Sequence, residues 1–266
     1  MRLAVLSDIH GNINALEACF EKIETLNIDG IIWCGDYITD IQKASEVIHF
    51  IKEKGKKYKQ YIVRGNREDY ILDYWKKEEV NWVVGSNEQS LMITYQALTE
   101  EELNWIKNLP TELWICEKDY PKILVSHKKI IDTEADIMIS GHTHRSETTY
   151  KHYTRYLNPG SVGFPFTGKT GSEFAILDYD NNHVSFEFYH ITYDIEKVIY
   201  QINQSGISGI KSNWDKLLIK MLLTGEDYIV PYLDRVKQLA ILNNLDENLD
   251  YVPKYLWEQA RKEIGF

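Results

Sequence analysis

The chain has 266 residues, of which 44% are hydrophobic and 26% are charged. This composition is typical of a globular protein, and it excludes a disordered, collagen-like or repeat-dominated chain. Forty acidic residues against 30 basic ones give a net charge of −10, which opposes general binding to nucleic acid but not to a small phosphorylated ligand.

The first part of the chain alternates short apolar runs with amphipathic segments. The expected strands span residues 3–7, 31–34 and 58–64. Helical spacing predicts one helix up to about residue 26, with Asn14 and Glu17 as its capping pair, and a second over 41–54. Repeated β-α-β units of this kind predict a parallel sheet with helices on its faces.

A mostly helical insertion is expected from about residue 67 to residue 109, and its last helix begins with a capping box of Thr99 and Glu102. Short strands and turns follow, with expected strands at 122–125, 137–140, 155–157, 174–179 and 183–193.

The remainder of the chain, residues 194–266, is predicted to be a helical extension packed on a core of residues 1–193. Its apolar stripe is typical of a helix that faces a core: Trp214, Leu217, Leu218, Met221 and Leu222. These helices are also candidates for a lid or for a contact in a homo-oligomer.

The three cysteines, Cys19, Cys34 and Cys116, form neither a disulfide framework nor a CxxC metal motif. We expect them to be buried core residues of a cytoplasmic protein. The first residues, MRLAVLSDIHGN, resemble neither a signal peptide nor a membrane anchor, because Asp8 and His10 break the apolar run at once. No membrane association is expected, since no stretch approaches the roughly 18 apolar residues of a spanning helix.

Five short polar stretches stand where predicted strands end: residues 8–10, 35–36, 65–68, 126–127 and 141–144. Ligands bind beyond the carboxyl ends of strands in open α/β sheets, so these loops are expected to converge. The candidate ligands among them are two carboxylates, one amide and four imidazoles, a mixed set that suits Mn, Fe or Zn better than Ca or Mg. Each stretch alone has a plainer explanation; Asn66, for example, could cap a helix with Asp69 as its partner.

The ordered series D-x-H, G-D, G-N-x-[ED], S-H and G-H-T-H resembles that of the calcineurin-like metallophosphoesterase superfamily. D-I-H-G-N near the start and N-P-G-S at 158–161 resemble its small bacterial phosphodiesterase branch, which includes asymmetric diadenosine tetraphosphate hydrolases. The resemblance covers residues 8 to about 165, and it is specific for the superfamily but not for the substrate. It implies an α/β fold, a four-layer α/β/β/α sandwich of two mixed sheets flanked by helices.

The resemblance also implies two divalent metal ions (Mn, Fe or Zn) that hold a hydroxide between them for in-line attack on phosphorus. One ion would be held by Asp8, His10 and His144, and the other by Asn66, His127 and His142. Asp36 would bridge the two ions. Asp36, Asn66 and His127 would thus be catalytic residues as well as ligands.

The sequence departs from the family pattern at Arg67, where many members have a histidine that assists the leaving group. Arginine stays charged and cannot act as a general acid, but it can bind phosphate through two hydrogen bonds and stabilise developing charge. We therefore count Arg67 among the catalytic candidates, and expect it to favour activated diesters or pyrophosphate links over alkyl monoesters. The alternative is a surface ion pair with Glu68 or Asp69.

Residues 163–170 match the phosphate-loop pattern G-x-x-x-x-G-K-[ST] letter for letter. A genuine loop of this kind requires a helix that starts at the lysine, whereas a strand is predicted at 174–179. The match is therefore expected to be a coincidence, with Lys169 left as a candidate substrate contact.

Four aromatic residues of the insertion, Tyr70, Tyr74, Trp75 and Trp82, follow Asn66 closely. They are expected either to pack the insertion against the body of the protein or to stack on a nucleobase.

Taken together, these patterns predict a dinuclear metal-dependent phosphoesterase, either a phosphodiesterase or a hydrolase of dinucleoside polyphosphates. The expected partner is a small phosphorylated substrate such as a dinucleotide. Two alternatives stay open: a phosphomonoesterase or protein phosphatase, and a non-catalytic protein-binding module on the same fold.

Overall fold

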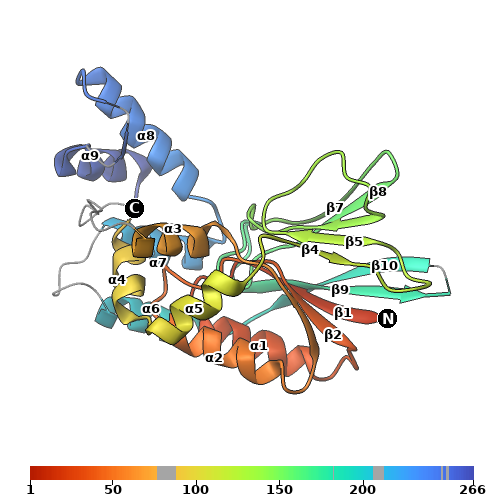
Figure 1. The fold of residues 1–266 in the computed structure, drawn as a ribbon. Helices are drawn as coiled ribbons and strands as arrows, with labels where there is room; N and C mark the ends of the chain where they lie inside the picture. The colour runs from red at the N-terminus through yellow and green to blue at the C-terminus, as the bar shows by residue number, and fades with distance from the viewer. Residues whose placement is uncertain (77–87, 182, 206–212, 247, 250–251) are drawn as a thin grey trace.

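Two mixed five-stranded sheets lie face to face in the computed structural model, which describes residues 1–76, 88–181, 183–205, 213–246, 248–249 and 252–266 (Figure 1). The first sheet has the order β10 (His183–Ile191), β9 (Ser172–Asp180), β1 (Arg2–Leu6), β2 (Gly30–Trp33) and β3 (Lys59–Ile62). The second has the order β4 (Glu112–Ile115), β5 (Ile123–Ser126), β6 (Ile137–Ile139), β8 (Thr154–Pro159) and β7 (Ser146–Lys151). The expected α/β sandwich of two mixed sheets is confirmed.

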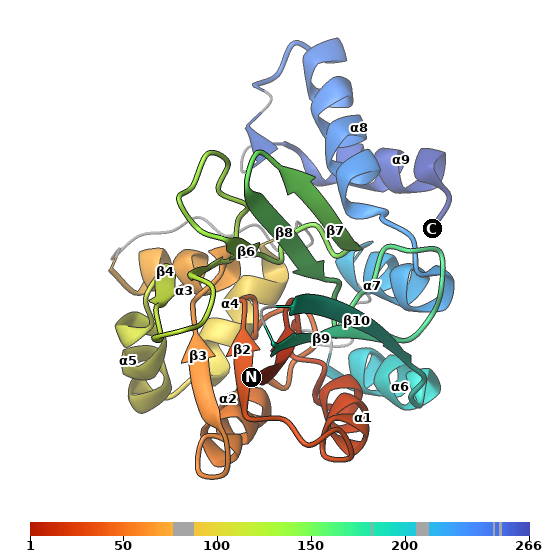
Figure 2. The same cartoon turned by 90° about the vertical axis from the view of Figure 1, so that its right-hand side faces the viewer.

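Helices cover the outer face of the first sheet, where α1 (Ile13–Ile23) and α2 (Ala44–Lys54) lie (Figure 2). The insertion forms α3 (Asn66–Lys76), α4 (Gln89–Ala97) and α5 (Glu100–Asn108). The C-terminal helices are α6 (Ile195–Ser205), α7 (Asn213–Thr224), α8 (Ile229–Leu242) and α9 (Lys254–Ile264). Within the described residues, no helix is both long and apolar enough to cross a bilayer.

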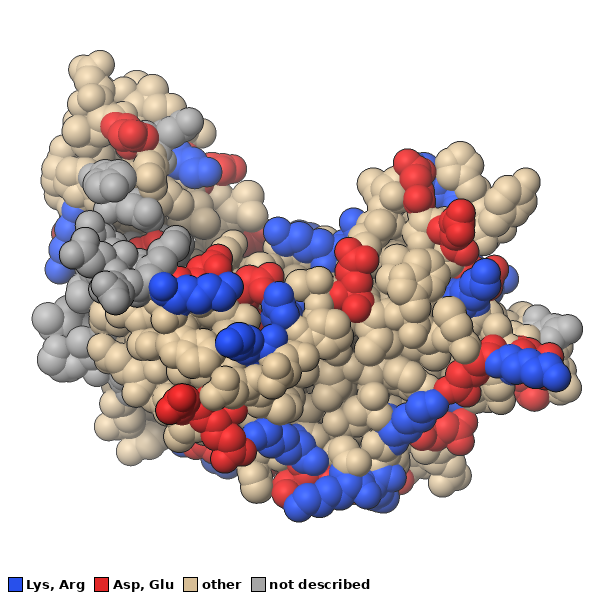
Figure 3. Space-filling model, in the orientation of Figure 1, with Lys and Arg blue, Asp and Glu red and all other residues tan. Residues whose placement is uncertain are grey.

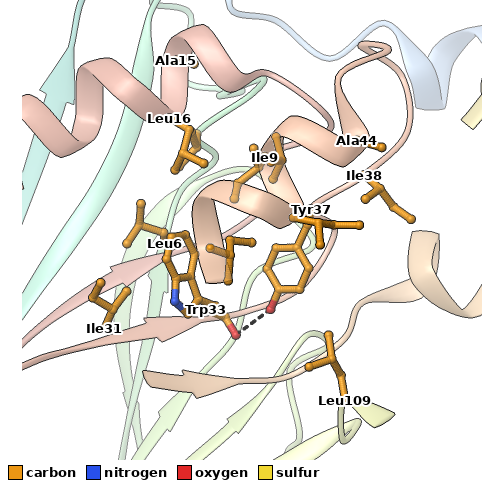
Figure 4. Packing of buried hydrophobic residues seen from close by; sticks show 14 of the residues in the cluster. Leu6, Ile9, Ala15, Leu16, Ile31, Trp33, Tyr37, Ile38, Ala44 and Leu109 are labelled. Carbon is orange, nitrogen blue, oxygen red and sulfur yellow. Dashed lines mark hydrogen bonds between the residues drawn. The ribbon is translucent and has the colours of Figure 1, made fainter. Parts of the chain in front are cut away.

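The side chains of strand β1 alternate between the two faces of the first sheet. Leu3 and Val5 pack into the cluster between the sheets, whereas Ala4 and Leu6 pack into the cluster under the helices, because successive side chains of a strand point to opposite faces. In the helix-side cluster, Leu6 lies beside Trp33, whose carbonyl accepts a hydrogen bond from the Tyr37 hydroxyl at 3.0 Å (Figure 4). The strand ends that carry the polar loops are therefore fixed from both faces.

A second hydrophobic cluster joins the C-terminal helices to the core. It contains the predicted stripe of α7, from Trp214 to Leu222, which is buried as expected. The same cluster contains Ile41, Phe164 and Phe166 from loops of the core. The C-terminal helices thus pack beside the carboxyl ends of the strands.

Some local predictions need correction. The N-cap of α1 is Asn12, whose side chain accepts a hydrogen bond from the Ala15 amide at 3.1 Å, and not Asn14. Cys19 and Cys34 are buried, but Cys116 is exposed just after the edge strand β4. The predicted capping box at the start of α5 is confirmed by reciprocal bonds between Thr99 and Glu102.

Candidate metal centre

The five polar loops converge on one edge of the sandwich. Strands β1, β2 and β3 are parallel in one sheet, and β5 and β6 are parallel in the other, so their carboxyl ends meet. The loops after β1 and β2 are joined directly, because the amide of Asp8 donates to the Gly35 carbonyl (3.0 Å) and the amide of His10 to that of Asp36 (3.0 Å). Residues from distant parts of the sequence are thereby brought within contact distance.

The first group of donor atoms belongs to Asp8, His10 and His144, all of them buried. The Nε2 atoms of the two histidines are 3.2 Å apart. Asp8 Oδ1 lies 3.3 Å from His144 Nε2 and 3.9 Å from His10 Nε2. One carboxylate oxygen and two imidazole nitrogens therefore face a common point.

The second group belongs to Asp8, Asp36 and His127, and it shares Asp8 with the first. His127 Nε2 lies 3.3 Å from Asp36 Oδ2 and 3.0 Å from Asn66 Oδ1. The sequence-predicted Asn66 thus adds an oxygen beside this group. Asn66 is the first residue of α3 and not the cap before it, which was the plainer alternative. Asp69, the expected capping partner, accepts a hydrogen bond from Arg64 at 2.7 Å.

The two oxygens of Asp36 have separate partners. Oδ1 accepts a hydrogen bond from the Arg67 amide at 2.8 Å. Oδ2 lies 3.9 Å from His10 Nε2 and 3.3 Å from His127 Nε2, and so it stands between a histidine of each group.

His142 lies at the rim of the centre and outside the two groups. Its ring is exposed and its centroid is 5.1 Å from that of His127. Its backbone amide donates to Asp8 Oδ2 at 3.0 Å. Partial burial and the neighbouring charge of His127 lower the pKa of His142, which favours the neutral form that a metal ligand needs.

The hydrogen bonds of the three buried histidines test whether these groups suit a cation. Each Nδ1 atom faces an oxygen acceptor: Asp40 Oδ2 for His10 (2.8 Å), the Cys34 carbonyl for His127 (2.8 Å) and the Phe164 carbonyl for His144 (2.7 Å). Each Nδ1 atom therefore carries a hydrogen and is held by its acceptor, so each Nε2 atom is the one that faces the carboxylate oxygens. Buried carboxylate oxygens and imidazole Nε2 atoms that converge in this way fit a metal ion, as the sequence predicted.

The backbone around the centre is unusual. Five of the seven residues implied as ligands have a positive φ, between 51° and 71°: Asp8, His10, Asp36, His142 and His144. Left-handed backbone is unfavourable for residues other than glycine, and it clusters at functional sites where the surroundings impose it. Gly65 and Gly141 allow the close approach, because a side chain at either position would overlap the Asp36 or the Asp8 carboxylate.

Glu68 is a buried carboxylate that the sequence interpretation considered only as part of the motif at 65–68 and as an ion-pair partner of Arg67. It accepts hydrogen bonds from the backbone amides of Gly65 (2.7 Å), Asp36 (2.8 Å) and Tyr37 (2.8 Å). Burial and the nearby Asp36 carboxylate raise the pKa of Glu68 to about 7. Its contacts tie the loop after β2 to the loop after β3, and so they fix the position of Asp36.

Arg67 does not form the surface ion pair with Glu68 or Asp69 that was the alternative. Its side chain is 12% exposed, and its Nη2 atom lies 3.7 Å from Asp40 Oδ2. Glu68 and Asp69 have other partners, as described above. The guanidinium lines the pocket beside the donor groups.

Two further predictions concern loops around the centre. No helix follows Lys169 in the phosphate-loop pattern, because β9 starts at Ser172. The loop packs instead on the C-terminal helices, where the Gly168 amide donates to the Gly225 carbonyl at 2.9 Å. Lys169 lies outside the residues that line the pocket.

The aromatic residues of the insertion mainly serve packing. Tyr74 contacts Tyr95 of α4 edge to face, with centroids 4.4 Å apart, and Trp75 packs on the helix-side core. Tyr70 is 48% exposed, and none of these three residues lines the pocket. Trp82 lies outside the described residues.

Protonation of the metal-free centre gives a first testable prediction. Burial disfavours a charged His127, but the Asp36 carboxylate outweighs this effect and raises the pKa of His127 to about 10. At neutral pH the imidazole therefore holds a proton that a metal must displace. Metal binding should release about one proton from this residue, and the affinity should rise between about pH 6 and pH 9.

Calorimetric titration of chelator-treated protein with Mn²⁺, in two buffers of different ionisation enthalpy, counts these protons. His152 in the exposed turn between β7 and β8 supplies the control, since His152→Asn should leave the count unchanged. A wild-type count of zero would contradict the prediction.

Comparison with known proteins places this arrangement in a family. The model of the calcineurin-like phosphoesterase superfamily domain matches residues 1–182, which include β1 to β9. An uncharacterised protein of Methanocaldococcus jannaschii is 24% identical over 233 residues, which cover 75% of this chain and 91% of that protein.

Two crystal structures share the fold. A hypothetical protein from Pyrococcus horikoshii aligns with a TM-score of 0.69 at 21% identity, covering 85% of this chain and 99% of the other. A metallophosphoesterase from Sphaerobacter thermophilus aligns with a TM-score of 0.64 at 20% identity, covering 85% and 100%. The matched segment contains both buried Asp/His groups, and the chain belongs to the calcineurin-like phosphoesterase superfamily.

Proposed function

We propose that the protein is a dinuclear metal-dependent phosphodiesterase, whose substrates include diesters or phosphoanhydrides of the dinucleotide type. The observation that carries this proposal is the position of Asp36 Oδ2 between His10 and His127. One oxygen with two such neighbours supports a carboxylate that bridges two cations. Mn, Fe and Zn all suit the mixed oxygen and nitrogen donors.

Each residue at the centre has a separate part in this proposal. Asp8, His10 and His144 would hold one ion, and His127, Asn66 and His142 the other. The bound ions would supply an activated water and neutralise charge on the phosphoryl oxygens. Arg67 would bind a phosphoryl oxygen and stabilise the charge that develops on the leaving group.

A pocket beside the donor groups supports a substrate with an apolar substituent. Its volume of about 400 Å³ lies in the range of small-molecule sites. Its lining includes both apolar and polar residues: Phe164, Phe166, Met221, Ile229 and Val230; Asn66, Arg67, His142 and Arg145. A planar ring such as a nucleobase can pack on the apolar residues while its phosphate meets the arginines.

A second pocket, of about 230 Å³, meets the centre at Asn66 and His127. Three cationic side chains and two carboxylates line it: Arg64, Lys128 and Lys129; Asp69 and Glu112. It therefore carries a small excess of positive charge in a protein whose net charge is −10. Lys and Arg side chains also lie in the hollow between the lobe of α8 and the β7–β8 hairpin (Figure 3). Two pockets at the centre give room for two substituents on a phosphoryl group. This favours a phosphodiester or anhydride over a monoester, which has only one substituent.

The proposal predicts metal-dependent hydrolysis with a preference for diesters. Chelator-treated protein, reconstituted with Mn²⁺, Fe²⁺ or Zn²⁺, would be assayed on bis(p-nitrophenyl) phosphate, p-nitrophenyl phosphate and diadenosine tetraphosphate. Chelation should lower the rate by about a hundredfold or more, and kcat/KM for the diester should exceed that for the monoester by about tenfold. Mass spectrometry of the metal content should give two ions per chain.

Other results would favour the alternatives. Faster hydrolysis of the monoester would indicate a phosphomonoesterase or protein phosphatase. Metal-loaded protein that hydrolyses none of these substrates, but is recovered with a stoichiometric protein partner, would indicate a binding module.

A further inference from the structure

Asp40 is a buried carboxylate that connects the candidate metal centre to the C-terminal helices. Its Oδ2 atom faces His10 Nδ1 at 2.8 Å and Arg67 Nη2 at 3.7 Å. Its Oδ1 atom accepts a hydrogen bond from the indole Nε1 of Trp214 at 2.9 Å. Trp214 lies on α7, 174 residues further along the chain.

The hydrogen bonds of the Asp40 side chain with His10 and Trp214 are costly to break. Asp40 and Trp214 are buried, and an unpaired buried carboxylate or indole N–H would lose its hydration without compensation. The backbone at Asp40 is left-handed, with a φ of 59°, so the loop is held in an unfavourable conformation that directs this side chain inward.

His10 differs in one respect from the other two histidines of the donor groups. His127 and His144 are oriented by backbone carbonyls, of Cys34 and Phe164 respectively. His10 is oriented by the Asp40 side chain. A backbone acceptor is fixed by the fold itself, whereas a carboxylate can rotate unless its other oxygen is also held. The Thr39 hydroxyl and Arg67 lie on the same Asp40 oxygen as His10, and Trp214 holds the other oxygen.

We infer that Asp40 is a positioning residue for His10 and Arg67, and that Trp214 of α7 holds Asp40 in place. The C-terminal helices thereby set the geometry of one metal site and of the arginine beside it. This inference rests on the proposed metal-dependent function, but its first consequence, the tautomer of His10, does not require a metal.

The test uses Trp214→Phe in the full chain, because phenylalanine fills most of the space of the indole but cannot donate the hydrogen bond. Trp257 provides the matched control. It lies in the same hydrophobic cluster and is equally buried, and its Nε1 atom donates to the Val252 carbonyl at 3.2 Å, away from Asp40. Both substitutions remove one buried indole hydrogen bond, so both should lower the free energy of unfolding, Trp214→Phe by more because it leaves a carboxylate oxygen without its donor.

The affinity for Mn²⁺ should differ between Trp214→Phe and Trp257→Phe. Loss of the partner of a ligating histidine costs 10–100-fold in affinity in other metalloproteins, so Trp214→Phe should weaken one of two Mn²⁺ sites by about tenfold or more. Trp257→Phe should stay within about twofold of the wild type, since the orientation of His10 does not depend on it. Calorimetry of chelator-treated protein measures both.

A second variant, Asp40→Asn, keeps an oxygen for the Trp214 indole but presents an amide N–H₂ to His10. Long-range ¹H–¹⁵N NMR of the metal-free protein should show His10 with its hydrogen on Nδ1 in the wild type and in Trp257→Phe, and on Nε2 in Asp40→Asn. Equal metal affinities of Trp214→Phe and Trp257→Phe, or an unchanged His10 tautomer in Asp40→Asn, would overturn the inference. A wild type that binds no metal would instead contradict the proposed function, and the NMR comparison would still test the role of Asp40.

Discussion

Replacement of Asp36 by asparagine is expected to lower kcat/KM for phosphodiester hydrolysis by at least about a hundredfold, more than the loss of a partner that only orients a ligand. The asparagine oxygen can still accept the hydrogen bond from the Arg67 amide (2.8 Å), so the loop should keep its conformation. The amide nitrogen would then replace Oδ2 between His10 and His127. A neutral N–H₂ group offers neither the negative charge nor the lone pairs that a bridging ligand needs.

Steady-state kinetics on bis(p-nitrophenyl) phosphate, together with the metal content of the purified variant, would measure this effect. Asp132→Asn is a suitable control, since Asp132 is an exposed carboxylate whose side chain pairs with Lys151 at 3.3 Å. The control should retain wild-type kinetics. If Asp36→Asn retained both the full rate and two bound ions, Asp36 would not be a bridge.

Glu68→Ala is expected to have the largest effect on stability. It would leave the buried amides of Gly65, Asp36 and Tyr37 without their acceptor. Unsatisfied buried donors cost about 1–3 kcal/mol each, but relief of the repulsion between Glu68 and Asp36 offsets part of the loss. We expect the free energy of unfolding to fall by about 3 kcal/mol. Urea denaturation of the chelator-treated protein measures the change without a contribution from bound metal.

Glu102→Ala is the matched comparison for Glu68→Ala. Glu102 also accepts a backbone hydrogen bond, from Thr99 at 2.8 Å, but at an exposed helix start. Water can replace it there, so the expected loss is only about 1 kcal/mol. Equal losses in the two variants would mean that Glu68 does not join the loops after β2 and β3 in the way that its contacts indicate.

The sequence was most informative about the polar residues that directly follow strands. The loops that carry Asp8, Asp36 and His127 converge because their strands are parallel, and short apolar runs in the sequence sufficed to predict those strands. The capping box of Thr99 and Glu102 was also predictable, because all its atoms lie within one helical turn.

Features that depend on distant contacts could not be predicted in the same way. Nothing in the local sequence connects Asp40 with Trp214, since their hydrogen bond joins elements that lie far apart in the chain. The ion pair of Arg67 with Asp40 was not foreseen for the same reason: the alternative considered for Arg67 involved only the adjacent carboxylates Glu68 and Asp69. Glu68 could have been suspected from its place three residues after Gly65, a spacing that suits a side chain folding back onto the amide that precedes a helix.

The hydrophobic cluster shared by core and C-terminal helices has a practical consequence for truncation. A recombinant fragment trimmed to residues 1–193 would uncover Ile41, Phe164 and Phe166. Each phenylalanine is worth roughly 1.5–3 kcal/mol when it is buried. Such a fragment would expose an apolar aromatic surface next to the pocket at the metal centre, and we expect it to aggregate. Loss of activity in this fragment would therefore not show that the C-terminal helices take part in the chemistry.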